Sequence, residues 1–166
     1  LKSPKLSKGP DRFIEIIKEI NKQKSIFVLL SGNRREYVIK ELTKLNIKFK
    51  YFEMADSKLM NELYNCLDLY IVASRVEGGP QAIIECALSK TPIISTDVGG
   101  LREVVEDSEV GYCCDKDNPK LFGERIIYLL KNPQIRQKMG LKGQKRVKKY
   151  FNSKKMSMEY YSLLTK

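Results

Sequence analysis

The chain has 166 residues, of which 42% are hydrophobic and 31% charged, and this balance predicts one globular domain over residues 1–166. It contains no histidine, which excludes the Ser–His, Cys–His and His-ligated metal mechanisms. No apolar run approaches the roughly 18 residues of a membrane-spanning helix, and the net charge of +11 favours an anionic partner over a cationic one.

The first half of the chain alternates between amphipathic helical patterns and short apolar runs. Pro10 stands near the first turn of a predicted helix. The uninterrupted run 25–31, ended by Gly32, predicts a parallel strand that is buried on both faces, and Asp56 or Ser57 is suited to cap a later helix. The elements expected here are a helix over Phe13 to Ile20, a strand at 25–31, a helix over Tyr37 to Leu45, a strand at about 47–52 and a helix over Leu59 to Leu67.

The second half continues the same alternation with short connections. The elements expected here are strands at 69–73, 92–95 and 110–113, a helix at 80–89, a short helix after the Gly99–Gly100 turn, and helices near 119–130, 133–150 and 153–164. This order predicts an α/β fold, a doubly wound, Rossmann-like parallel sheet with helices on both faces. Ligands of such sheets bind beyond the C-terminal ends of the strands, so the loops after Ser31, Phe52, Ala73 and Ser95 are the expected site.

The cysteines and acidic residues give no pattern of metal ligands. Cys66, Cys86, Cys113 and Cys114 form no CxxC pair, and the first two stand in apolar helical contexts that predict small core residues. Asp115 and Asp117 have the DxD spacing but follow the last predicted strand, so a turn is expected there. We therefore expect no metal and no other cofactor, and a reducing, cytoplasmic compartment.

The most informative segment is the loop and helix from Ala73 to Ala87. Gly78 and Gly79 allow a ligand to approach the backbone closely because they lack a Cβ atom. Pro80 suits the first position of a helix, and the free amides behind it, beginning at Gln81, form an anion site. A diphosphate fits this description.

Two acidic residues flank that predicted anion site. Glu85 lies in an otherwise apolar stretch that predicts a helix buried nearly all round, where a carboxylate needs partners. Glu77 lies on the loop side, so the two carboxylates could bind hydroxyl pairs at either end of a nucleotide-sugar. On spacing alone the alternative carries equal weight: Glu85 pairs internally with Arg75 or Lys90, and Glu77 is a surface loop residue.

The segment resembles the signature of family-4 glycosyltransferases, and the likeness extends in order over nearly the whole chain. Lys8–Gly9 resembles the basic residue before the first helix, and Ser31-Gly32-Asn33 the glycine-rich turn after an early strand. The other matching positions are Ser74, Glu77, Gly78, Glu85, Ala87, Pro92-Ile93-Ile94, Thr96, Gly99-Gly100 and Val110-Gly111-Tyr112.

The resemblance implies one lobe of a two-lobed GT-B enzyme that retains the anomeric configuration of a sugar taken from a nucleoside diphosphate. By that resemblance Glu77 contacts the transferred sugar, Glu85 the ribose, and Lys8 the leaving diphosphate, with Lys2 or Lys5 in place of the usual arginine. The backbone of Gly78, Gly79, Pro80 and Gln81 and the Gly32 turn would complete the donor site. Gly79–Pro80 replaces the family's Phe-Gly, which bears on donor identity more than on reaction class.

The same resemblance implies partners outside the chain. An N-terminal acceptor lobe is expected in the longer protein, since the chain opens with Leu1 and carries the features of the C-terminal lobe only. The acceptor is expected to be a glycan or a lipid-linked molecule, in polysaccharide or glycolipid biosynthesis.

The C-terminal segment 142–166 has eight basic residues against Glu159 alone. This charge indicates either a solvated helix face or peripheral contact with the inner face of a membrane. A nucleic-acid-binding module is disfavoured because basic and aromatic residues do not interleave there. A non-catalytic regulatory lobe that binds nucleotide-sugars stays open.

Overall fold

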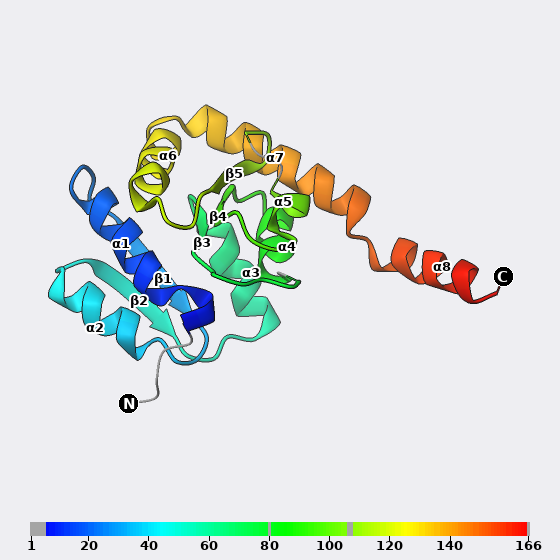
Figure 1. Ribbon diagram of the computed structural model, residues 1–166, viewed down its shortest axis with the longest axis horizontal. Coiled ribbons are helices and arrows are strands. Elements are labelled where there is room, and N and C mark those ends of the chain that lie inside the picture. The colour runs from blue at the N-terminus through cyan, green and yellow to red at the C-terminus, as the bar shows by residue number, and fades with distance from the viewer. Residues whose placement is uncertain (1–5, 80, 106–107, 166) are drawn as a thin grey trace.

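The computed structural model describes residues 6–79, 81–105 and 108–165, which form an alternating α/β domain (Figure 1). A short 3-10 turn, η1 (Leu6–Lys8), precedes the first helix. The strands are β1 (Phe27–Ser31), β2 (Lys48–Phe52), β3 (Tyr70–Val72), β4 (Ile93–Thr96) and β5 (Gly111–Cys114). The helices are α1 (Pro10–Asn21), α2 (Glu36–Lys44), α3 (Ser57–Asn65), α4 (Gln81–Leu88), α5 (Leu101–Val104), α6 (Pro119–Lys131), α7 (Pro133–Tyr150) and α8 (Ser153–Leu164).

Among the residues that the structure describes, all strand pairs are parallel, and they fall into two hydrogen-bonded groups, β1–β2 and β3–β4–β5. The four residues of β4 are buried on both faces. Ile94 packs into the core formed with α1 and α6, whereas its neighbour Ile93 packs into a second core formed with α4, α5 and α7. Because successive strand residues point to opposite faces, helices cover both sides, and this confirms the predicted doubly wound fold.

Several local predictions are confirmed, and those for the run 25–31 and for Cys66 are wrong. The carboxylate of Asp56 caps α3 by accepting the backbone N–H of Leu59 at 2.8 Å, and Asp115 and Asp117 lie at a turn. The run 25–31 is not buried on both faces: Val28 and Leu30 are buried, but Phe27 is 61% exposed because it begins β1 away from the helical core. Cys66 is exposed, not part of the core, since α3 ends one residue before it.

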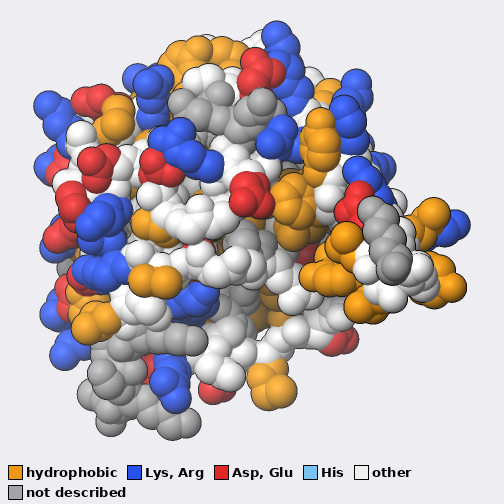
Figure 2. Space-filling model, turned by 45° about the vertical axis from the view of Figure 1, so that its right-hand side comes forward, with side chains coloured by type: hydrophobic (Ala, Val, Ile, Leu, Met, Phe, Trp, Pro, Cys, Tyr) orange, Lys and Arg blue, Asp and Glu red, His pale blue; other side chains and the backbone are white. Residues whose placement is uncertain are grey.

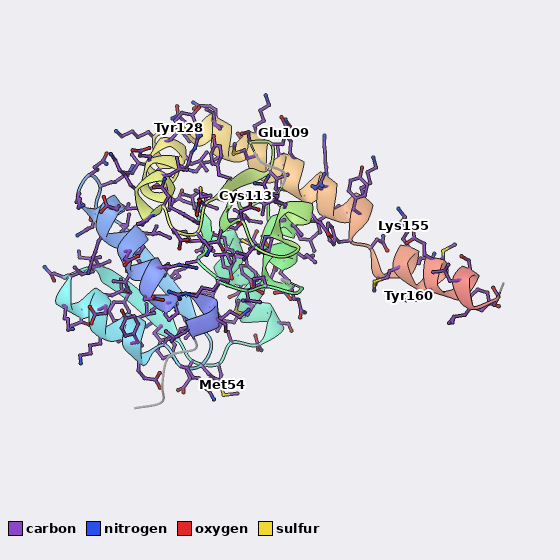
Figure 3. All side chains as sticks on the ribbon, viewed as in Figure 1. Met54, Glu109, Cys113, Tyr128, Lys155 and Tyr160 are labelled. Carbon is purple, nitrogen blue, oxygen red and sulfur yellow. The ribbon has the colours of Figure 1, made fainter. Side chains whose placement is uncertain are left out.

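The C-terminal helix α8 projects away from the rest of the domain (Figure 1). None of its residues is buried, and Lys155 and Tyr160 both extend from it beyond the domain (Figure 3). Hydrophobic side chains gather on this projection (Figure 2). Within the described part of the chain, no helix has both the length and the apolarity to cross a membrane.

Candidate functional site

Two glycine turns hold the loop that follows β3. Gly9, at φ +61°, lies so close to this loop that a Cβ atom would stand 1.8 Å from the carbonyl oxygen of Ala73. Gly99, at φ +54°, lies equally close at the other end, where a Cβ atom would stand 1.9 Å from the carbonyl oxygen of Glu77. Only glycine tolerates both the left-handed backbone and this approach. The loop is thereby fixed between the start of α1 and the β4–α5 turn.

Within this loop Glu77 meets Lys8 and Ser74. The Lys8 Nζ atom donates to Glu77 Oε1 at 2.5 Å, and the Ser74 hydroxyl donates to the same oxygen at 2.8 Å. The side chain of Glu77 is 10% exposed and that of Lys8 is 45% exposed. Ser74 is itself buried, and its carbonyl oxygen accepts a hydrogen bond from the buried Thr96 hydroxyl at 2.7 Å. The carboxylate of Glu77 is therefore held by two donors at its Oε1 atom.

Arg75 joins the loop to the turn that carries Lys8. Its guanidinium donates to both carboxylate oxygens of Asp11, at 2.7 and 2.5 Å, and its backbone N–H donates to the carbonyl oxygen of Ser7 at 2.8 Å. The hydrogen bond from Arg75 lowers the pKa of Asp11 to about 2, so Asp11 is charged at neutral pH. Lys8 and Glu77, distant in sequence, are therefore locked side by side by bonds on either flank.

Glu85 has different partners from those considered on sequence alone. Its Oε1 atom accepts from Gln81 Nε2 at 3.1 Å and its Oε2 atom from the Tyr64 hydroxyl at 3.2 Å, while Arg75 binds Asp11. The prediction that this helix is buried nearly all round is wrong, because Gln81 and Leu88 are exposed and Glu85 is half-buried. One side of α4 faces solvent, which lowers the cost of placing a carboxylate there.

A cavity of about 860 Å³ extends from between β1 and β3 to the C-terminal ends of these strands. Its lining includes Lys8, Glu77, Gly79 and Gln81 from the predicted site, together with Ser31, Arg35, Tyr64 and Ser74. The cavity also passes the buried core residues Ile17, Ile20 and Ile126, so only part of this volume lies at the predicted site. Four of the predicted site residues therefore share one cavity, at the edge of the sheet where the fold class predicts a ligand.

The remaining predicted residues lie beside the cavity or outside the described chain. Among the residues that the structure describes, Gly78, Gly32 and Glu85 do not line it. Glu85 contacts two residues that do, Tyr64 and Gln81. Gly32 keeps a left-handed turn, at φ +84°, in which its N–H donates to the Phe52 carbonyl at 3.0 Å. Lys2, Lys5 and Pro80 lie outside the described residues.

Several side chains of the cavity have no role predicted from the sequence, and two of these, Ser74 and Tyr64, donate to the carboxylates of Glu77 and Glu85. Ser74 belongs to the glycosyltransferase signature, three residues before Glu77. Its hydroxyl is a possible hydrogen-bond donor to that carboxylate, and this is the signal that the sequence offers. Tyr64 gave no signal, because it lies on α3, 21 residues before the carboxylate to which it donates. Only the packing of α3 against α4 brings that pair together.

Comparison with known proteins places these features in a family. The model of the family described as glycosyl transferases group 1 matches residues 3–146. An uncharacterized glycosyltransferase of Methanocaldococcus jannaschii is 30% identical over 146 residues, which are 86% of this chain and 40% of that protein. The chain thus spans about two-fifths of the length of this curated relative.

Two solved structures share the fold. The C-terminal domain of a glycosyl transferase group 1 family protein from Francisella tularensis superposes with a TM-score of 0.74 at 23% identity, over 89% of this chain and 81% of that one. S. aureus TarM, solved in complex with UDP among other ligands, superposes with a TM-score of 0.83 at 18% identity, over 99% of this chain and 34% of that one.

Proposed function

The chain belongs to the glycosyl transferases group 1 family, and we propose that it is the donor-binding lobe of a retaining glycosyltransferase. The whole enzyme would move a sugar from a nucleoside diphosphate to a glycan or lipid-linked acceptor. One observation carries the proposal: Lys8 and Glu77 lie in contact at a cavity that is also lined by Gly79 and by Gln81 at the start of α4. A cation, a carboxylate and a helix N-terminus are the groups that a sugar diphosphate requires.

Each part of the donor has a counterpart in this arrangement. The first amides of α4 and the ammonium group of Lys8 would bind the diphosphate. The carboxylate of Glu77, held through Oε1 by Lys8 and Ser74, would accept hydroxyl groups of the sugar through its other oxygen. Glu85 would accept the ribose hydroxyls. The roles proposed for Pro80 and Lys2 follow the family resemblance alone, and Gly78 and Gly32 would shape the backbone near the donor.

The reaction would need no histidine and no metal from this lobe. The bond between the anomeric carbon and the diphosphate oxygen breaks, and the acceptor oxygen forms a new bond on the same face of the sugar. The acceptor proton passes to the departing phosphate oxygen. Lys8 and the helix amides would stabilise the charge that develops on the diphosphate. Any further base would come from the acceptor lobe.

The surface of α8 supports the proposal that a second lobe completes the enzyme. Met156, Tyr160, Leu163 and Leu164 recur at helical spacing, which forms an apolar stripe, and each is more than half exposed. Exposed apolar stripes of this kind mark contact surfaces. We propose that the stripe packs against an N-terminal acceptor lobe. The isolated chain is then expected to bind donor weakly and to show no turnover.

The basic residues before and within α8 carry a separate proposal, a peripheral contact with an anionic membrane. Lys145, Lys148, Lys149 and Lys154 are predominantly solvent-facing and add to the positive charge of segment 142–166. The chain is expected to sediment with phosphatidylglycerol vesicles at low salt and to be released at high salt. Replacing Lys148, Lys149 and Lys154 with Gln should abolish the difference in sedimentation between low and high salt. Equal partitioning to phosphatidylglycerol and phosphatidylcholine vesicles would remove the proposal.

The donor function is tested by thermal stability in the presence of nucleotide-sugars. A ligand that binds only the folded chain raises the free energy of unfolding by RT ln(1 + [L]/Kd), so a weak ligand is detectable at high concentration. Of the UDP-, GDP- and ADP-sugars, we expect one nucleotide class to raise the melting temperature in a saturable way. The parent sugars without nucleotide serve as the control. No saturable shift with any of the three classes would contradict the proposal.

A further inference from the structure

Tyr64 is a buried tyrosine whose hydroxyl reaches a carboxylate of the site. It is 5% exposed, and its ring packs edge-on against Tyr70, with ring centroids 5.9 Å apart. The Tyr64 carbonyl oxygen accepts a hydrogen bond from the buried Thr91 hydroxyl at 2.9 Å. The hydroxyl donates to Glu85 Oε2 at 3.2 Å. Backbone and ring are thus both fixed, and the hydroxyl contacts α4 through Glu85.

The phenol is a permanent donor in this position. Burial, above all, raises the pKa of Tyr64 well above that of a free tyrosine, and the neighbouring Tyr70 and Glu85 raise it further. The hydroxyl therefore keeps its proton throughout the physiological pH range. A neutral hydroxyl beside a charged carboxylate can only donate to it.

The two donors to Glu85 differ in how firmly they hold it. Gln81 lies one turn earlier on the same helix, and it is exposed. Tyr64 is buried, comes from α3, and anchors the carboxylate from outside its own helix. An exposed amide pays side-chain entropy to stay in place, whereas the tyrosine is already immobilised by its packing. The orientation of Glu85 therefore depends mainly on Tyr64.

We propose that Tyr64 is a positioning residue for ribose recognition: it holds Glu85 so that the carboxylate presents its free acceptor sites to the two ribose hydroxyls of the donor. The proposal rests on the donor function proposed above and adds a residue to it. Each carboxylate oxygen accepts more than one hydrogen bond, so the bonds from Tyr64 and Gln81 leave acceptor capacity on both. Preorganisation of this kind lowers the entropy cost of binding.

The test measures binding of a nucleoside diphosphate and of its dideoxy analogue, which lacks both ribose hydroxyls. The probe is whichever of UDP, GDP or ADP stabilises the unaltered chain most, and its affinity is measured by calorimetry. Tyr64→Phe removes only the hydroxyl. We expect it to weaken binding of the natural nucleotide by roughly three- to tenfold, as for one hydrogen bond, and to leave binding of the dideoxy analogue unchanged. Tyr37→Phe, a half-buried tyrosine on α2, is the matched control and should change neither.

Glu85→Gln and the double variant Tyr64→Phe/Glu85→Gln distinguish a failure of the inference from a failure of the proposed donor function. Tyr64→Phe and Glu85→Gln are expected to be non-additive for the natural nucleotide, since one acts through the other. Equal losses for the natural and dideoxy nucleotides in Tyr64→Phe would show a merely structural role and overturn the inference, as would unchanged affinity for both. If Glu85→Gln still distinguishes the two nucleotides as the unaltered chain does, the ribose role of Glu85 is wrong and the inference with it. If no nucleoside diphosphate binds the unaltered chain, the donor function itself is overturned.

Discussion

Replacing Lys8 with methionine is expected to weaken binding of the preferred nucleoside diphosphate by roughly tenfold or more. The ammonium group lies at the cavity, in contact with Glu77, and a hydrogen bond between charged groups contributes about 1.5–3 kcal/mol. A loss of 1.4 kcal/mol corresponds to about a tenfold change in Kd. Methionine keeps the length of the apolar stem and removes the charge. Calorimetric titration of the variant against the unaltered chain measures the effect.

A matched control is available on α2. Lys44 makes an ion pair with Glu41 at 2.6 Å on the exposed side of that helix, so Lys44→Met removes an equivalent surface charge far from the cavity and should leave affinity unchanged. Glu77→Gln is expected to affect the nucleoside diphosphate and the nucleotide-sugar in different ways. It frees Lys8 from its partner, so binding of the nucleoside diphosphate should be kept or strengthened, whereas binding of the nucleotide-sugar should weaken. Equal affinity in Lys8→Met and the unaltered chain would rule out a diphosphate at Lys8.

The order of helices and strands could be predicted closely because each element carries its own local signal. Pro10 begins α1 and Asp56 caps α3, as their residue types indicate. The failures concern burial. Phe27 has the composition of a buried strand residue, yet its exposure depends on which helices cover the first position of β1. Cys66 is likewise exposed, because α3 ends one residue before it. The local sequence pattern of a segment does not show which other segments of the chain pack against it.

The site was predictable to the level of residues and not to the level of contacts. The family resemblance predicts Glu77, Lys8 and Gln81 as donor residues, and the structure places all three at one cavity. Their proposed roles stay predictions. The direct contact of Lys8 with Glu77 joins positions 69 residues apart, and the contact of Glu85 with Tyr64 joins two different helices. The first pair depends on the close approach of Gly9 and Gly99 to the loop after β3, and the second on the packing of α3 against α4.

Gly99→Ala is therefore expected to be among the most damaging single substitutions in the chain. The backbone of Gly99 has φ +54°, and an alanine Cβ would stand 1.9 Å from the Glu77 carbonyl oxygen and 3.0 Å from its carbonyl carbon. The strained backbone costs about 1 kcal/mol for a residue with a side chain, and the clash forces the loop to move. We expect the free energy of unfolding to fall by on the order of 3 kcal/mol, measured by urea denaturation.

Gly100 provides the control next to it in sequence. A Cβ atom there would meet nothing nearer than the Gly78 carbonyl oxygen at 3.9 Å, an ordinary contact, and its φ is −76°. Gly100→Ala should change stability by no more than about 1 kcal/mol, chiefly through its place at the start of α5. Because the atom displaced by Gly99→Ala belongs to Glu77, the surviving folded protein should also lose affinity for nucleotide-sugar. A Gly99→Ala variant that is destabilised yet binds the nucleotide-sugar normally would show that the loop position and the donor site are independent. In that case the bonds from Lys8 and Ser74 would suffice to hold the Glu77 carboxylate in place.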